Sequence, residues 1–247
     1  MKDLFSFENR TPKYENTGQR LETEFIGNIN KRKYDELAFD YIQKQSQRFN
    51  QKQSPNHSTQ IDEVENEFER MLQMREAASE HFNSFTKIRN KENYIDYKNS
   101  MDLVEKSQYG DPEKPNKFFS AALYNYIKNR FDEKYSLKFY TAAGLTHLDI
   151  LHGVDCFFKL LDKKSGQEIT KTTIDLTGNR EKNQSRADVL IKLSQEEKNQ
   201  IDPSKENKNF NKEILRERID NYGEIIVQSL VNNYEEKIKQ EALLENN

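Results

Sequence analysis

Residues 143–193 contain the one cluster of strand-like sequence in the chain, and this cluster constrains the fold most. Cys156–Leu161 (CFFKLL) is an apolar run, Ile169–Thr177 (ITKTTIDLT) is dense in β-branched residues, and the polar, glycine-bearing stretch Lys163–Glu168 (KKSGQE) lies between them. Two such runs around a short loop that contains glycine predict a β-hairpin. A third apolar run, Ala187–Leu193 (ADVLIKL), predicts a further strand.

Helix-like patterns surround the strand-like cluster. Apolar residues recur at steps of three or four residues, which is the spacing of one helix face. The helices that this spacing predicts span residues 19–49, 61–88, 118–135 and 212–244. We therefore predict an α/β (α+β) fold, in which a small mixed sheet with a β-hairpin is flanked by helices and preceded by a long helical and extended N-terminal region.

Two polar stretches interrupt this pattern. Residues 43–60 are rich in Gln, Ser and Asn, which is typical of a linker, and residues 107–117 bring a glycine and two prolines close together. Because Gly and Pro end regular structure, the second stretch predicts a boundary. The expected organisation is a helical and extended arm region over 1–110 and an α/β core over 117–247 that ends in a C-terminal amphipathic helix.

Composition narrows the classes of function. Hydrophobic residues make up 34% of the chain and charged residues 33%, with a mean hydropathy of −1.07, so we expect part of the chain to stay extended or to order on a partner. A net charge of −3 argues against a protein that coats nucleic acid and leaves room for a local basic groove.

The single cysteine excludes an intramolecular disulfide and a cysteine-cluster zinc site. No apolar run approaches the roughly 20 residues that span a bilayer, so we expect no membrane partner and a cytoplasmic protein, or one that is incorporated into a virion.

Two acidic residues are placed at the ends of the predicted hairpin strands. Asp155 opens the first strand and Asp175 lies near the end of the second. With the midpoint of the loop near residue 165, an antiparallel register puts the two carboxylates side by side. Mg²⁺ takes oxygen ligands and keeps several waters, so one or two carboxylates are enough to hold it. The sequence therefore predicts a Mg²⁺ site with Asp155 and Asp175 as ligands, of the kind that a metal-dependent phosphodiesterase needs.

These motifs resemble those of the PD-(D/E)xK nuclease superfamily, also called restriction-endonuclease-like. In that family an Asp opens one strand, a (D/E)-x-K tripeptide lies on the next, and a helix and a further strand follow. Leu148–Asp155 (LDILHGVD) resembles the start of the first motif, and Ile174–Thr177 (IDLT) resembles the second. The resemblance covers about residues 117–230 and implies a nuclease-like fold for the core.

The chain departs from the family at the lysine of the second motif. Thr177 stands at that position. The nearest replacement is Lys182, with Arg180 as a second candidate, and both belong to a polar, basic stretch that is also typical of an exposed loop. The resemblance implies that Lys182, Asp155 and Asp175 are the catalytic residues of an active member.

Four further titratable residues fit a nuclease site less well. Glu22 or Glu24 could correspond to the glutamate that some nucleases carry on a helix. The sequence favours the alternative, in which both are solvent-exposed charges on a helix surface. His147 and His152 flank the first motif, and a His near an acidic site can act as a general base. The sequence favours surface positions for both.

Two functions of different classes remain. The first is a Mg²⁺-dependent DNA nuclease, in which the two Asp residues hold the metal and Lys182 orients the attacking water. The second is a non-enzymatic structural or assembly component that uses the fold as a scaffold and binds protein partners or further copies of itself through its N- and C-terminal helices. Abundant Lys, Asn, Ile, Phe and Tyr indicate AT-rich codons, which are typical of a low-GC bacterium or one of its phages. In a phage, a ring or connector protein of the virion is an example of such an assembly component. A helical adaptor or DNA-packaging accessory without nuclease ancestry is a third alternative.

Overall fold

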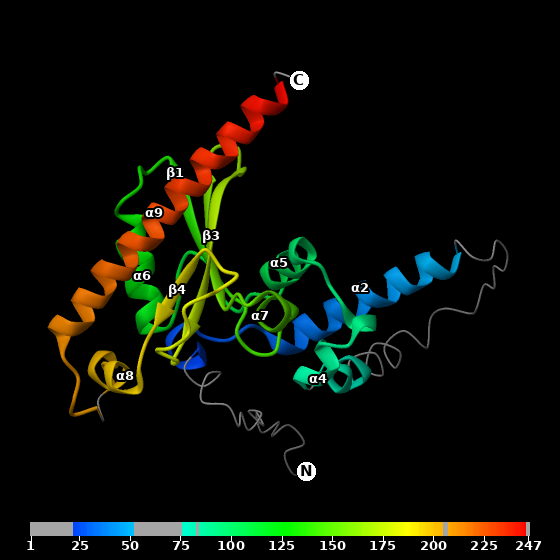
Figure 1. Ribbon diagram of the computed structural model, residues 1–247, viewed down its shortest axis with the longest axis horizontal. Helices are drawn as coiled ribbons and strands as arrows, with labels where there is room; N and C mark the ends of the chain where they lie inside the picture. The colour runs from blue at the N-terminus through cyan, green and yellow to red at the C-terminus, as the bar shows by residue number, and fades with distance from the viewer. Residues whose placement is uncertain (1–21, 52–75, 83, 205–206, 246–247) are drawn as a thin grey trace, which may run out of the picture.

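The computed structural model describes residues 22–51, 76–82, 84–204 and 207–245. They form a mixed α/β fold in which a four-stranded sheet is packed against helices on both faces (Figure 1). The predicted fold class is therefore confirmed. A helical N-terminal region precedes the sheet, and a long C-terminal helix follows it.

The sheet has the order β1-β2-β3-β4, so every strand lies next to its neighbour in sequence. Its strands are β1 (Tyr135–Thr141), β2 (Cys156–Asp162), β3 (Glu168–Thr177) and β4 (Val189–Lys192). The first three strands are antiparallel, and β4 runs parallel to β3. β2 and β3 form the predicted hairpin, in which Gly166 adopts a left-handed φ of 69° and donates its N–H to Asp162 O at 2.8 Å.

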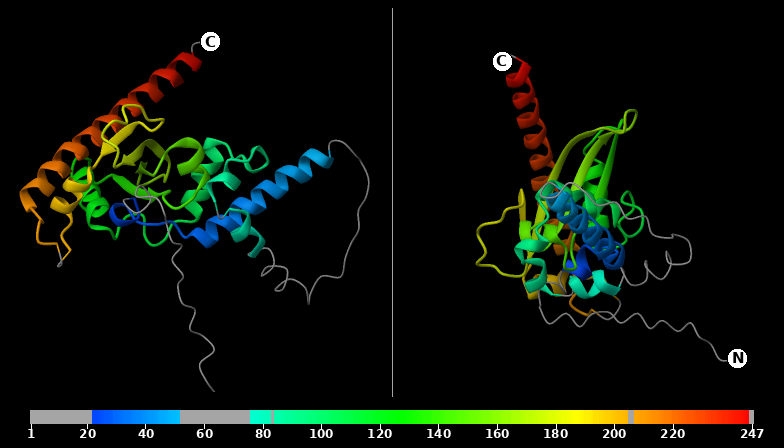
Figure 2. Two further views of the ribbon diagram at one scale, coloured as in Figure 1. Left: turned by 60° about the horizontal axis from the view of Figure 1, so that its bottom comes forward. Right: turned by 90° about the vertical axis from the view of Figure 1, so that its right-hand side faces the viewer.

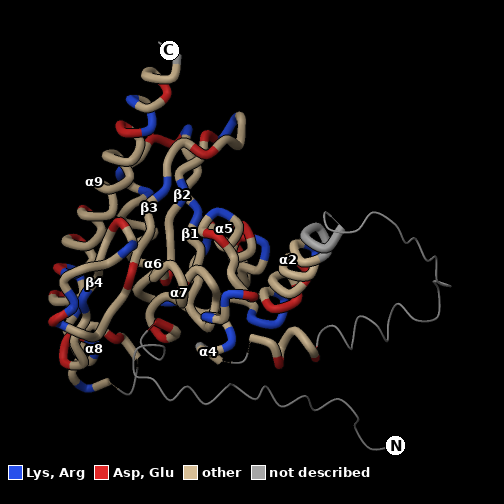
Figure 3. Tube along the Cα trace, turned by 45° about the vertical axis from the view of Figure 1, so that its right-hand side comes forward, with Lys and Arg blue, Asp and Glu red and all other residues tan. Residues whose placement is uncertain are grey.

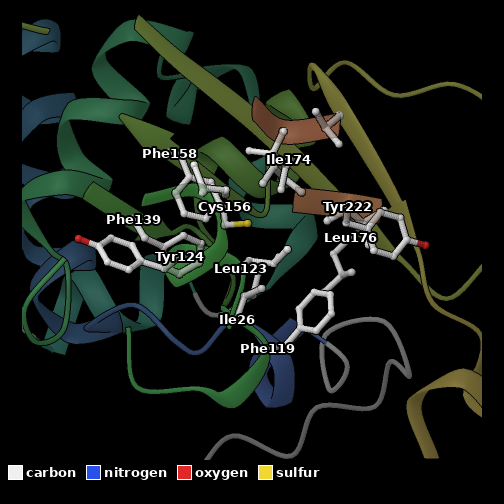
Figure 4. Packing of buried hydrophobic residues seen from close by; sticks show 14 of the residues in the cluster. Ile26, Phe119, Leu123, Tyr124, Phe139, Cys156, Phe158, Ile174, Leu176 and Tyr222 are labelled. Atoms are coloured by element: carbon white, nitrogen blue, oxygen red, sulfur yellow. The ribbon is translucent and has the colours of Figure 1, made fainter. Parts of the chain in front are cut away.

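Side chains that alternate along the strands supply two hydrophobic cores. Cys156 and Phe158 face α6 (Phe118–Lys128) and α9 (Lys212–Glu245), where they pack with residues such as Leu123 (Figure 4). Phe157 points to the opposite face and belongs to a second cluster with residues of α2 (Lys31–Gln51), α5 (Tyr97–Lys106) and α7 (His147–His152). The apolar runs of β2 and β3 are thus explained by burial on both sides.

Two of the predicted helices, over 118–135 and 212–244, are observed with different accuracy at their ends. The predicted helix over 118–135 ends as α6 at Lys128 because the chain turns there to begin β1 at Tyr135. The helix predicted over 212–244 is observed as α9, and in one view acidic and basic residues alternate along it (Figure 3). α9 continues past the sheet at its C-terminal end (Figure 2). No helix within the described ranges is long and apolar enough to cross a membrane.

The N-terminal helix predicted over 19–49 is broken. A helical turn at residues 22–25 is separated from α2 because Gly27 adopts a φ of 91° and the Asn30 Oδ1 accepts the N–H of Lys33 at 3.1 Å, as an N-terminal cap does. α2 continues to Gln51, so the first half of the linker predicted over 43–60 is helical instead, and the rest of that stretch lies outside the described residues.

Shorter helices complete the described chain. They are α4 (Phe85–Ile88), the 3₁₀ helix η1 (Lys91–Asn93) and α8 (Gln195–Ile201). Most of the helix predicted over 61–88 lies outside the described residues. The boundary predicted at 107–117 stays a prediction, and α5, which precedes it, packs against β1 and α7.

Candidate acidic site at the end of the sheet

The register of the β2–β3 hairpin places Asp155 beside Asp175. The ladder starts with Cys156 opposite Ile174, and the same register continued by one residue puts Asp155 opposite Asp175. The Asp155 N–H donates to Ile174 O at 2.9 Å, and the Asp155 Oδ2 accepts the N–H of Leu176 at 2.6 Å. Both Asp side chains are buried. The hairpin register expected from a loop midpoint near residue 165 is thus confirmed by the pairing of Cys156 with Ile174.

Lys182 lies against Asp175. Its Nζ is 2.5 Å from the Asp175 Oδ2, which also accepts a hydrogen bond from the Ser185 hydroxyl at 2.8 Å. Both partners come from the loop over 178–188, which has no helix. The residue singled out as a replacement for the missing lysine is therefore the one that reaches the second Asp, whereas Arg180 turns to α8 and contacts Ser194 at 2.8 Å.

Two further carboxylates join Asp155. Oxygens of Glu22, Asp149 and Asp155 all lie within 4.8 Å of one another. Glu22 comes from the helical turn at residues 22–25. Asp149 lies in the first turn of α7, where its N–H donates to the Thr146 hydroxyl at 3.1 Å. We call Glu22, Asp149 and Asp155 the acidic triad.

Two oxygens of the acidic triad lack hydrogen-bond partners. The Glu22 Oε2 and the Asp149 Oδ2 are buried, and neither has a partner among the described residues. Glu22 as a whole is only 8% exposed. Buried polar atoms in native structures are nearly always paired, and an unpaired one costs free energy. These two oxygens are therefore free to contact a bound cation.

Burial and mutual repulsion favour the protonated form of Glu22. Burial is the larger cause and raises the pKa of Glu22 to about 8, with Asp149 and Asp175 acting in the same direction. The ammonium groups of Lys182 and Lys198 act against this shift. The site therefore has more negative groups than its lysines can neutralise.

The pKa values of Asp149 and Asp155, the other two members of the triad, are raised as well. Burial raises the pKa of Asp149 to about 7, although backbone N–H groups partly stabilise its carboxylate. Burial, followed by the charge of Glu22, raises the pKa of Asp155 well above its ordinary value. A positive ion between these groups would relieve both the desolvation and the repulsion.

The triad fits the ligand preference of a small hard cation. Mg²⁺ binds oxygens at about 2.0–2.1 Å, so two ligands on opposite sides of the ion are about 4 Å apart. Separations within 4.8 Å need only a small side-chain adjustment to reach this value. Of the two metal ligands that the sequence predicts, Asp155 belongs to the triad, whereas Asp175 does not and instead binds Lys182 and Ser185.

Sequence reasoning assigned Glu22 to a solvated helix surface, and this was wrong. Phe25, three residues on, packs its ring against Phe118 and Phe119 of α6, with ring centroids 5.2 and 5.5 Å away. Ile26 is buried in the same core. Spacings of three and four residues put Glu22 on the helix face of Phe25 and Ile26, and this was the available signal.

Sequence reasoning gave Asp149 no role of its own and placed it only within the stretch that resembles the start of the first nuclease motif. Thr146 and Asp149 form the N-terminal cap of α7, and the same turn directs the carboxylate to Asp155. The surface position predicted for His147 is wrong, since it is fully buried with its Nδ1 2.9 Å from the Tyr34 hydroxyl. His152 is half-buried, and its Nε2 is 3.0 Å from Ile95 O.

Comparison with known proteins adds no relative. No protein-family model, no curated protein and no solved structure matches this chain. The function is therefore argued from the geometry of the acidic triad and its neighbours.

Proposed function

We propose that this protein is a Mg²⁺-dependent phosphodiesterase that cleaves DNA, with a fold of the PD-(D/E)xK type. One observation carries the proposal. The acidic triad holds two buried carboxylate oxygens without partners, directly beside the ion pair of Lys182 and Asp175. One end of the sheet thus carries carboxylate oxygens that can bind a divalent metal ion, and the Lys182 ammonium, which can contact a phosphate.

The topology supports the same proposal. Asp155 precedes β2, Asp175 lies on the adjacent strand β3, and a further strand, β4, follows parallel to β3. Two features differ from the family pattern. The lysine comes from the loop after β3, and residues 178–188, between β3 and β4, form no helix.

Each residue has a physical role in this proposal. The carboxylates of Glu22, Asp149 and Asp155 would hold the cation, which when bound stabilises the charge that develops on the phosphoryl oxygens. The Lys182 ammonium stabilises negative charge on the same phosphate and orients the attacking water. Asp175 holds Lys182 in place, and the Ser185 hydroxyl fixes the Asp175 carboxylate.

Cleavage assays on supercoiled and linear DNA with Mg²⁺ or Mn²⁺ test the proposal. The wild type should cleave, and Asp155→Asn and Glu22→Gln should not. Asp102→Asn is the matched control, because the Asp102 carboxylate is exposed on α5 and pairs with Lys106 at 2.6 Å. Cleavage that is absent in the wild type with either metal, or that survives in Glu22→Gln, would contradict the proposal.

A second candidate function is that of an assembly component, and α9 favours it. Tyr234, Ile238 and Leu244 are exposed on the C-terminal part of α9, and the end of this helix extends past the sheet (Figure 2). Tyr234 and Ile238 are four residues apart and share one face of the helix, and exposed apolar residues in this arrangement are typical of a helix that contacts another surface. Light scattering on the purified chain tests this: a concentration-dependent oligomer that Tyr234→Ser or Ile238→Ser disrupts supports it, and a monomer at all concentrations contradicts it.

A further inference from the structure

A cavity opens at the β1 edge of the sheet, and one of its walls is the segment that follows the helical turn of Glu22. Its volume is about 510 Å³, and its walls are the segment over 26–31, the loop over 108–117 and the end of β1. Ile26, Ile29 and Phe139 supply apolar surface. Cavities of about 300–1,000 Å³ are typical of small-molecule sites, which combine an apolar lining with a few polar groups.

Several polar side chains that line this cavity have no hydrogen-bond or ion-pair partner among the described residues. The side-chain amides of Asn28 and Asn116, the ammonium of Lys117 and the hydroxyl of Tyr109 all line it. None of them makes a hydrogen bond or ion pair within the described part of the chain. Lys114, by contrast, lies 3.9 Å from Asp111. The lining thus offers an uncompensated positive charge together with free donors and acceptors.

This combination matches the parts of a nucleotide. An Asn amide offers a donor and an acceptor in the arrangement that pairs with a base edge. A lysine binds phosphate, and an exposed tyrosine such as Tyr109, which is 68% exposed, provides a surface on which a base stacks. The apolar side chains of Ile26, Ile29 and Phe139 suit the faces of a base.

The cavity and the acidic triad are joined by short, rigid links. Ile26 in the cavity wall donates its N–H to Glu22 O at 2.8 Å, one helical turn away. Thr141 in the opposite wall pairs with Cys156, the neighbour of Asp155, and its hydroxyl donates to Gly27 O at 3.1 Å. A strand with one phosphate at the triad can therefore place an adjacent nucleotide in the cavity.

We propose that this cavity binds one unpaired nucleotide of the DNA strand whose phosphodiester lies at the acidic triad. This inference rests on the proposed function and specifies its substrate as a strand with an unstacked base. A base within a duplex would have to leave the stack to enter the cavity, at a cost of a few kcal/mol. The protein should therefore prefer single-stranded DNA, or the frayed end of a duplex, over an intact duplex.

Fluorescence anisotropy with a labelled single-stranded oligonucleotide, in buffer that contains EDTA, tests the cavity without cleavage. Lys117→Ala should weaken binding about tenfold through the lost phosphate contact, and Asn116→Ala should weaken binding in a way that depends on the base. Lys163→Ala is the matched control: it removes one lysine from the hairpin turn between β2 and β3, outside the cavity lining. Equal affinities for Lys117→Ala, Asn116→Ala and the control would overturn the inference.

Amide chemical shifts give a second readout. A nucleoside monophosphate should shift the amides of Gly27 and Gly110, which line the cavity, and inorganic phosphate at the same concentration should not reproduce the pattern. Identical shifts with phosphate alone would overturn the assignment of a nucleotide. Strand binding that depends on Lys117, in a wild type that never cleaves, would support the cavity and contradict the nuclease proposal. Cleavage by the wild type together with strand binding that does not depend on Lys117 would support the nuclease proposal and contradict a nucleotide site in the cavity.

Discussion

The carboxylate of Glu22 lies within 4.8 Å of that of Asp155, although the two residues lie far apart in the sequence, Glu22 in the N-terminal region and Asp155 directly before β2. Glu22 is held there by the packing of Phe25 against α6, and Asp155 by the hydrogen bond from Leu176 to its Oδ2. Both carboxylates are thus fixed by the fold. This preorganisation is what a cation site requires, because ligands that are already in place lose little freedom on binding.

Replacement of Lys182 should separate cation binding from catalysis. Lys182 contacts Asp175 at 2.5 Å and does not belong to the acidic triad, so Lys182→Met should retain cation affinity. Cleavage should fall roughly 10²–10³-fold, as is typical when one group that stabilises developing charge is removed. Single-turnover cleavage at saturating Mn²⁺ measures this, with Lys163→Met as a control for the loss of one surface lysine. Full activity in Lys182→Met would show that another group has this role.

Removal of the Tyr34 hydroxyl should destabilise the protein and disturb the helix that carries Asp149. This fully buried hydroxyl accepts the N–H of His147 at 2.8 Å and lies 2.9 Å from the Nδ1 of the same residue. Tyr34→Phe leaves two buried groups of His147 unpaired, at a cost of about 1–3 kcal/mol.

Chemical denaturation of Tyr34→Phe measures that cost. Tyr41→Phe is the control on the same helix, since its half-buried hydroxyl donates to Asp96 at 3.3 Å and accepts from Gln45, where water can replace the lost partner. We also expect a weaker cation affinity in Tyr34→Phe, because α7 positions Asp149. Equal free energies of unfolding for the two variants would argue against a structural role for the buried hydroxyl.

Asp35 should make stability depend on pH in a direction opposite to that of an ordinary surface carboxylate. Burial raises the pKa of Asp35 to about 6, although the ion pair with Lys31 acts against this shift. Because the folded pKa is above the ordinary value of 3.8, the folded state holds a proton between pH 3.8 and pH 6 that the unfolded state has lost. The contribution of Asp35 to stability therefore decreases as pH rises through that window.

Urea denaturation of wild type and Asp35→Asn at about pH 4 and at pH 7 measures this contribution. The stability of wild type relative to Asp35→Asn should be lower at pH 7 by on the order of 2–3 kcal/mol. Asp40→Asn is the control, since Asp40 lies on the same helix and pairs with Lys44 at the surface. A difference between wild type and Asp35→Asn that does not vary with pH would rule out this linkage.

Sequence reasoning identified those parts of the site that lie close together along the chain. The alternation in β2 and β3 and the glycine in their turn specify the hairpin, and with it the pairing of Asp155 and Asp175. Lys182 follows β3 directly, so a short loop can bring it back to Asp175.

The remaining parts depend on contacts between distant segments. Glu22 reaches the site because the rings of Phe25, Phe118 and Phe119 pack together, and nothing in the local sequence specifies which helix Phe25 will contact. Asp149 depends on the direction in which α7 leaves its Thr146 cap. Local patterns specify elements and register, whereas tertiary packing decides which charges meet.

Titration of Mn²⁺ into the metal-free protein by calorimetry, for wild type, Glu22→Gln and Asp102→Asn, tests the central claim most directly. The acidic triad predicts saturable binding in the wild type and in Asp102→Asn, and a loss of affinity of about tenfold or more in Glu22→Gln, which keeps the shape of the side chain and removes one charged ligand. No saturable binding in the wild type, or equal affinity in Glu22→Gln, would contradict a cation site at the triad.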